Sequence, residues 1–143
     1  MEIKQISVFL ENKPGMLTEF AKILQKNEIS MKALCLAETP EYGVLRVIVD
    51  DNYKISTVLK DEGYVFKATP VLAAAIPDKP GSLVKILDIL AENDINLEYT
   101  YAFIARKKDE AYIILRVEDN EKAKKAFRDN GVRLLSQEDI DEM

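Results

Sequence analysis

The sequence predicts an α+β protein built from two similar units, each with the order strand-helix-strand-strand-helix-strand. Two observations carry this prediction. One is an internal repeat that spans most of the chain, and the other is hydrophobic spacing that switches between the period of a strand and that of a helix. The chain has 143 residues, of which 48% are hydrophobic and 31% charged. This composition is globular, and the length suits one domain or two very small ones.

The repeat appears when the chain is shifted by 66 positions, which lays Lys13-Pro14-Gly15 on Lys79-Pro80-Gly81. The same shift aligns five further identical pairs: Leu17 with Leu83, Ile23 with Ile89, Leu24 with Leu90, Asn27 with Asn93 and Ile29 with Ile95. Later the offset becomes 68, which places a two-residue insertion in the second copy near Arg106-Lys107-Lys108. We therefore expect two units, residues 1–69 and 70–143, joined without a linker and packed as one rigid body.

The first half of each unit predicts a strand and an amphipathic helix separated by the Lys-Pro-Gly turn. Ile6, Val8 and Leu10 alternate with polar or small residues, which is the spacing of a strand. After the turn, apolar residues recur at i, i+3, i+4 and i+7, which predicts one buried helix face. These residues are Leu17, Phe20, Ala21 and Leu24 in the first copy, and Leu83, Ile86, Leu87 and Leu90 in the second.

The second half of each unit predicts two strands, a short helix and a closing strand. The strands cover 31–37 and 44–49 in the first copy, and 97–104 and 112–117 in the second. Residues 50–52 and 118–120 are typical helix caps, and Gly63 and Gly131 suit the helix ends. The acidic tail 138–142 indicates a solvated run of charge. The whole pattern predicts a ferredoxin-like fold in each unit, with the two units side by side in one eight-stranded antiparallel sheet and helices on one face.

Composition excludes several classes of function. The chain has no histidine, so it has no Ser-His-Asp triad and no zinc site that needs imidazole, and its single cysteine, Cys35, forms no internal disulfide. A net charge of −5 argues against nucleic acid as a partner. The longest apolar run, Val71 to Ile76, is too short to cross a membrane, and the first residues lack the layout of a signal peptide. We expect a cytoplasmic protein that is no enzyme and needs no cofactor or metal.

The motifs of both copies resemble those of the ACT domain family. The segments that carry the resemblance are 12–17 and 78–83, which look like the entry to the first helix, and 27–30 and 93–96, which look like the turn that follows it. The chain is similar over nearly its whole length to small tandem ACT proteins. The resemblance implies a regulatory role, with an amino acid bound at the interface between the two units. It also allows the alternative of a ligand-free module that assembles with a metabolic enzyme.

A ligand carboxylate fits the start of a helix, where free N–H groups and the helix dipole favour an anion. Gly15 and Gly81 let backbone approach closely there. Asp78, or the neutral carbonyl of Asn12, would accept the ligand ammonium group, and the resemblance adds Ser30 and Asn96 as polar contacts. Without a ligand, the same residues make an ordinary turn and helix cap. The candidate ligand-binding residues at these motifs are Asn12, Pro14, Gly15, Met16, Leu17, Ser30, Asp78, Pro80, Gly81, Ser82, Leu83 and Asn96.

The second copy carries Tyr99 and Tyr101 where the first has Ala33 and Cys35. This asymmetry favours one good site over two equivalent ones, with the two tyrosines as pocket walls. Plain packing of aromatic residues on a sheet explains the same pattern. The small or apolar residues on the helix-free face of the first strands, among them Phe9 and Ala73, indicate a homodimer contact.

Overall fold

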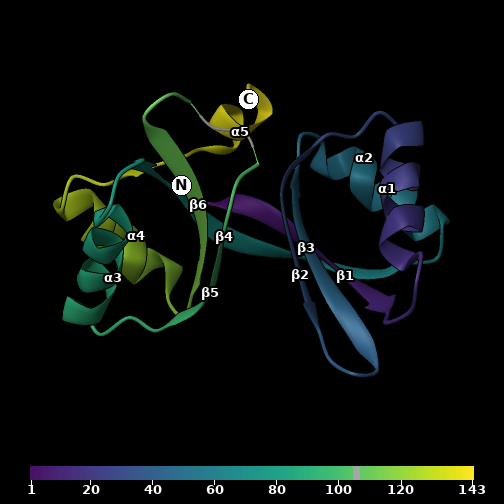
Figure 1. Cartoon of the computed structure of the whole chain (residues 1–143). Coiled ribbons are helices and arrows are strands. Elements are labelled where there is room, and N and C mark those ends of the chain that lie inside the picture. The colour runs from purple at the N-terminus through teal and green to yellow at the C-terminus, as the bar shows by residue number, and fades with distance from the viewer. Residues whose placement is uncertain (105–106) are drawn as a thin grey trace. The chain divides into compact units, whose positions relative to one another are not determined.

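The computed structural model describes residues 1–104 and 107–143 (Figure 1). Contacts divide them into two compact units: an N-terminal unit, Lys4–Thr69, and a C-terminal unit that joins Met1–Ile3 to Pro70–Met143. Residues 1–3 therefore belong to the C-terminal unit, although the rest of the strand that begins at Ile3 belongs to the N-terminal unit. Of the expected insertion near residues 106–108, Arg106 lies outside the described residues.

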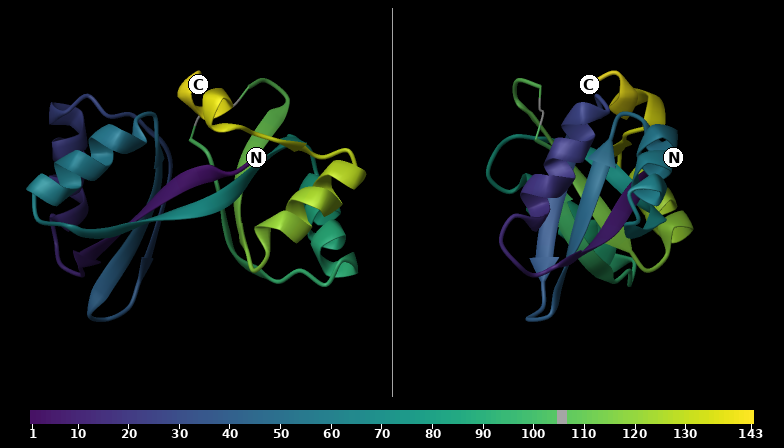
Figure 2. Two further views of the ribbon diagram at one scale, coloured as in Figure 1. Left: turned by 180° about the vertical axis from the view of Figure 1, so that it is seen from behind. Right: turned by 90° about the vertical axis from the view of Figure 1, so that its right-hand side faces the viewer.

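The N-terminal unit packs two helices on one face of an antiparallel sheet (Figures 1 and 2). Its strand order is β2-β3-β1-β4. The register of β1 against β3 places Ile6 opposite Val47 and Val8 opposite Leu45, which aligns the core-facing rows of both strands. The elements are β1 (Ile3–Glu11), α1 (Met16–Lys26), β2 (Met31–Glu38), β3 (Tyr42–Val49), α2 (Asn52–Asp61) and the start of β4 (Val65–Pro77).

The C-terminal unit repeats this arrangement with the strand order β7-β4-β6-β5. Its core contains Leu72, Leu115 and Phe127, all fully buried. The elements after β4 are α3 (Ser82–Glu92), β5 (Leu97–Ala102), β6 (Glu110–Val117), α4 (Asn120–Asp129), β7 (Arg133–Leu134) and α5 (Gln137–Asp141). Helices α3 and α4 cover one face of the strands, and α5 lies on the other side of them (Figure 2).

The predicted α+β fold class is confirmed, and so are the predicted helix ends. Asp51 and Asp119 cap α2 and α4, and their carboxylates accept hydrogen bonds from the backbone N–H of Lys54 at 2.9 Å and of Lys122 at 3.1 Å. Gly63 and Gly131 follow these helices with φ values of 78° and 70°. A positive φ at this position is what a helix C-terminus favours, and glycine adopts it without strain.

Three details differ from the prediction. The eight expected strand positions are filled, within the described residues, by seven strands, because the 13-residue β4 closes the N-terminal unit and opens the C-terminal one. The buried face of α3 is Ile86, Ile89 and Leu90, whereas Leu83 and Leu87 are exposed by 42% and 39%. A helix buries a stripe of limited width on one side. The apolar residues of α3, which lie between Leu83 and Leu90, cover more of the helix surface than this stripe, so some of them are exposed.

The third difference concerns the acidic tail, which is ordered as the helix α5, while Glu138, Asp141 and Glu142 are exposed as a solvated charge run requires. Ser136 and Asp139 form a capping box at its start, and Ile140 is fully buried. Two features stabilise this short helix. Ile140 buries its one apolar side chain, and the capping box satisfies the first N–H groups of the helix.

Candidate functional site

A cavity of about 490 Å³ opens at the start of α3. Its wall combines the end of β4, the Lys-Pro-Gly turn, the first turn of α3 and the connection from α4 to β7. Three predicted ligand-binding residues, Pro80, Gly81 and Ser82, belong to this wall. The volume lies in the range of small-molecule sites. All lining residues belong to the C-terminal unit.

Gly81 fixes how the chain enters α3. Its φ of 89° lies in the left-handed region, and a side chain there would contact nothing within 4 Å, so backbone conformation and not space requires the glycine. As the N-cap it offers no side-chain oxygen to the helix. The backbone N–H of Ser82 donates to the Lys79 carbonyl at 3.3 Å. The next N–H groups of α3, those of Leu83 and Val84, have no side-chain cap and are available to an anionic ligand.

Ser82 adds a polar group that has no protein partner. Its hydroxyl oxygen is buried and makes no hydrogen bond within the described part of the chain. A buried hydroxyl without a partner is costly, and most such groups are satisfied by water or a ligand. Ser82 is the first residue of α3 and lines the cavity, so a ligand bound in the cavity can supply the missing hydrogen-bond partner.

Three cationic side chains line the cavity: Lys79, Lys85 and Arg133. Lys85 follows Ser82 by three residues, which places the two on one face of α3. Arg133 makes only long ion pairs, at 3.7 Å to Glu110 and 3.8 Å to Asp139, and its side chain is half exposed. No acidic residue is among the described lining. The cavity therefore combines excess positive charge with an uncapped helix start, which suits a carboxylate.

The cavity at the start of α1 in the N-terminal unit lies against the β2–β3 hairpin and not against the segment after the second helix, and it is smaller and of opposite charge. It measures about 140 Å³ and contains Asn12, Gly15, Met16 and Leu17 from the predicted set. Glu11 and Glu38 line it, and its one lysine, Lys13, pairs with Glu11 at 3.2 Å. Under the shift of 66 positions, Met16 and Glu19 stand where the other unit has Ser82 and Lys85. The start of α1 is uncapped like that of α3, but this cavity lacks the excess positive charge that favours a carboxylate.

The remaining predicted residues lie outside these two cavity walls. Ser30 and Asn96 follow the C-terminal ends of α1 and α3, about 16 Å from the Pro-Gly turns given the rise of an 11-residue helix. Within one unit they do not join the turn in a single cavity. Pro14 is exposed in its turn, and Leu83 is exposed on α3. Asn12, by contrast, lines the N-terminal cavity, and its side chain donates to the Thr39 carbonyl at 3.2 Å, which ties the turn to the β2–β3 hairpin.

Asp78, Tyr99 and Tyr101 are not among the residues that line these two cavities. The backbone N–H of Asp78 donates to the Asp109 carbonyl at 2.9 Å, and Asp78 stands between Pro77 and Lys79, which both line the cavity at α3. Tyr99 and Tyr101 are half-buried on β5 and stack with ring centroids 6.5 Å apart.

Sequence reasoning missed Lys85 and Arg133. The spacing of Lys85 from Ser82 was a usable signal, since both fall on one face of the predicted helix. Arg133 lies about 50 positions further along the chain, on a two-residue strand with no pattern of its own, so only the fold brings it to the cavity.

No cluster of acidic, cysteine or histidine side chains that would hold a metal occurs among residues 1–104 and 107–143. Over the same residues, none of the helices has the length and apolar character needed to span a membrane.

Comparison with known proteins gives one family and several similar structures. The family described as an ACT domain pair matches residues 1–143. The crystal structure of protein BT0572 from Bacteroides thetaiotaomicron is 35% identical, with a TM-score of 0.93, and the match covers 100% of this chain and 98% of that one. No curated protein matches.

Two regulatory subunits of aspartate kinase share the fold at lower identity. The ligand-free form from Thermus thermophilus is 17% identical with a TM-score of 0.63, over 88% of this chain and 91% of that chain. The subunit from Thermus flavus is 16% identical with a TM-score of 0.57, over 90% and 92% of the two chains.

Proposed function

Because the chain belongs to the family of ACT domain pairs, we propose that it is a regulatory protein without catalytic activity that binds an amino acid at the start of α3. The observation that carries this proposal is the 490 Å³ cavity in which Ser82, with its unpartnered hydroxyl, meets three cations at an uncapped helix start. We propose residues 1–69 and 70–143 as the two ACT domains.

Each part of an amino acid finds a group of matching chemistry. The carboxylate accepts hydrogen bonds from the first N–H groups of α3 and from the Ser82 hydroxyl, and Lys85 balances its charge. Asp78, flanked by the lining residues Pro77 and Lys79, is the acceptor we assign to the ammonium group. Ala75, Ile76, Ile86 and Val132 provide apolar contact for the side chain of the ligand.

A thermal-shift screen of the whole chain against the twenty amino acids, each at millimolar concentration, tests the proposal. A ligand at about one hundred times its Kd adds about 2.7 kcal/mol, which corresponds to a rise of several degrees in Tm. The amide of the amino acid that binds, which lacks the carboxylate, should give no shift.

Two variants locate the site. Ser82→Ala and Lys85→Gln should each weaken the binding roughly tenfold, since each removes a group that contacts the carboxylate. Lys22→Gln, which removes an exposed lysine of α1 in the N-terminal unit, is the matched control and should bind as the parent does. Binding that is equally strong in all three variants would refute this location.

Control of an enzyme is the regulatory role we propose for the bound state. Its support is the shared fold of the aspartate kinase regulatory subunits. Ligand binding would favour one conformation of the pair, and a partner enzyme that prefers that conformation would respond. With one cysteine and no metal requirement, we place the protein in the cytoplasm.

Assembly without a ligand is the second candidate, and exposed apolar residues on α3 favour it. Leu83, Val84 and Leu87 are 42%, 57% and 39% exposed. The homodimer contact expected at Ala73 needs another surface, because Ala73 is fully buried in the chain. Under this alternative no amino acid changes the Tm, and Val84→Lys lowers the mass of the assembly measured by light scattering. Val65→Lys, at an equally exposed valine on β4, is the control.

A further inference from the structure

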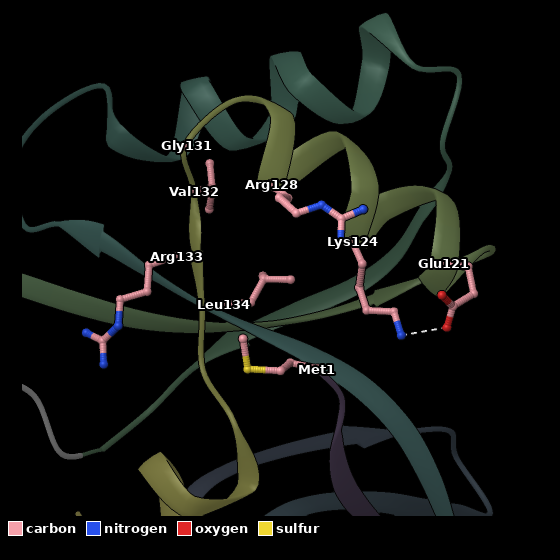
Figure 3. Close-up of a pocket in the computed structure, with 8 residues that line it drawn as sticks. All are labelled: Met1, Glu121, Lys124, Arg128, Gly131, Val132, Arg133 and Leu134. Carbon is pink, nitrogen blue, oxygen red and sulfur yellow. Dashed lines mark ion pairs between the residues drawn. The ribbon is translucent and has the colours of Figure 1, made fainter.

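A second cavity, of about 510 Å³, lies between α4, β7 and the first residue of the chain (Figure 3). Helix α4 contributes Glu121, Lys124 and Arg128, and the following segment contributes Val132 and Leu134. Met1 belongs to the same unit and completes the wall. The two cavities share the connection between α4 and β7, Gly131 to Arg133, whereas Met1, Glu121, Lys124, Arg128 and Leu134 line only this one.

The charge of Lys124 is already balanced inside this cavity. Its Nζ donates to Glu2 at 3.0 Å and also pairs with Glu121, the contact drawn as a dashed line in Figure 3. The Lys124 side chain is only 19% exposed. Two carboxylates around one ammonium group leave Lys124 little capacity to attract a further anion.

Arg128 has no such partner. Its guanidinium makes no hydrogen bond or ion pair with any residue that the structure describes. Asp129, its neighbour in sequence, is occupied by Lys125 at 2.9 Å. Arg128 also follows Lys124 by four residues on one face of α4, so the two cations repel each other. An anion beside Arg128 relieves this repulsion and uses a planar set of donors that suits a carboxylate.

The rest of the wall is apolar. Figure 3 shows the Met1 side chain close to Leu134. Val132, two residues before Leu134 on the same extended segment, also lines the cavity. Met1 is 63% exposed, so apolar surface of its side chain is uncovered at the mouth of the cavity.

We propose that this cavity is a second binding site, for a small organic monoanion that places its carboxylate on Arg128 and its apolar body against Met1, Val132 and Leu134. Arg133 also lines this cavity, but it pairs with Glu110 at 3.7 Å and with Asp139 at 3.8 Å. The guanidinium of Arg128 therefore balances one negative charge, which favours a carboxylate over a phosphate dianion. The site needs no ammonium group on the ligand, and in this it differs from the amino-acid site at α3.

Phenylacetate tests the proposal, with phenylacetamide and acetate as comparisons. Phenylacetate has both the charge and the apolar body, phenylacetamide has the body alone, and acetate has the charge alone. Titrations of the whole ¹⁵N-labelled chain should shift the amide signals of Arg128 and Leu134, which line this cavity alone, with phenylacetate. Affinity should be at least about tenfold weaker for either comparison compound. Equal binding of phenylacetate and phenylacetamide, or shifts confined to other residues, would overturn the proposal.

Arg128→Gln should weaken phenylacetate binding roughly tenfold, because it removes the charge and keeps a polar side chain. Lys122→Gln removes one cation from the same helix outside the cavity, and Lys85→Gln removes one from the amino-acid site. Both should bind phenylacetate within about twofold of the parent. An unchanged affinity in Arg128→Gln would overturn this site. If Lys85→Gln loses amino-acid binding and retains phenylacetate binding, the two sites bind their ligands independently. Failure of one proposal then leaves the other unaffected.

Discussion

Gly81 shows at the scale of one residue why the Lys-Pro-Gly turn ends in glycine. Its φ of 89° is disfavoured for residues with a Cβ, yet a Cβ built there contacts nothing within 4 Å. We therefore expect Gly81→Ala to lower the free energy of unfolding by about 1 kcal/mol through backbone strain alone. Gly81→Asn should cost less, because asparagine tolerates the left-handed region. Urea unfolding of the three proteins measures both values, and equal costs for alanine and asparagine would contradict strain as the cause.

Tyr64 carries a buried hydroxyl with no hydrogen-bond partner among the described residues, and its ring packs edge-on against Phe20 at 6.0 Å. Tyr64→Phe keeps the ring and removes the unsatisfied group. We expect the free energy of unfolding to stay equal or rise by up to about 1 kcal/mol. Tyr53→Phe, at a side chain 84% exposed, is the control and should change nothing.

The same residue gives a dependence on pH. Burial, with smaller contributions from Glu19 and Glu62, raises the pKa of Tyr64 above its ordinary value of 10.0. Above pH 10 the unfolded chain loses this proton first, so the parent protein loses stability as the pH rises. Tyr64→Phe lacks that loss. Guanidinium unfolding at pH 8 and pH 10.5 should therefore show a larger advantage of the variant at the higher pH, and a constant difference would contradict the assignment.

Helix α5 shows what a capping box contributes to a short element. The Asp139 carboxylate accepts from the Ser136 backbone N–H at 2.8 Å, and that hydrogen bond lowers the pKa of Asp139 below its ordinary value of 3.8. Asp139→Asn should reduce the free energy of unfolding by about 1 kcal/mol at pH 7. Because the folded pKa is depressed, this contribution is present above pH 3.8 and disappears as the pH falls below it.

Urea unfolding at pH 7 and pH 2.5 measures this difference. Glu138→Gln removes the same charge from the same helix at an exposed position, without touching the capping box. It should leave stability nearly unchanged at both pH values. A cost in Glu138→Gln as large as that in Asp139→Asn would attribute the effect to net charge instead of the cap.

At the scale of elements, the sequence predicted those features whose cause is local. Strand alternation, the Asp51 and Asp119 caps and the glycines after α2 and α4 depend on neighbours within a few residues, and all of them are confirmed. The continuous β4 and the buried face of α3 depend on tertiary packing, which apolar spacing alone does not determine. Leu83 illustrates this, since it fits the predicted stripe as well as Ile86 does but is exposed.

The residues of the candidate site also fall into two groups, those that local sequence predicts and those that only the fold brings to the cavity. Pro80, Gly81 and Ser82 were predictable because a turn motif and a helix start are contiguous in sequence. Arg133 reaches the same cavity from a two-residue strand that only the pairing of β7 with β4 positions. The free guanidinium of Arg128 could not be anticipated at all, because its isolation depends on Asp129 being paired with Lys125.

At the scale of the whole molecule, the duplication produced two copies of the fold but not two copies of the site. The cavity at α3 is about 490 Å³ and cationic, while the one at α1 is about 140 Å³ and lined by Glu11 and Glu38. A carboxylate is therefore expected to enter only the former. The two copies share the fold and differ in the size and charge of the cavity beside the Lys-Pro-Gly turn.

This asymmetry predicts one amino acid bound per chain, which isothermal titration calorimetry measures as the stoichiometry. Exchanging residues between the copies tests the cause. Ser82→Met combined with Lys85→Glu gives α3 the residues of α1 and should abolish binding, because it removes the hydroxyl and reverses a charge at the carboxylate. Met16→Ser combined with Glu19→Lys is the reciprocal control and should leave the stoichiometry at one. Two ligands per chain in the parent, or loss of binding in the reciprocal variant, would show that the N-terminal unit contributes a site of its own.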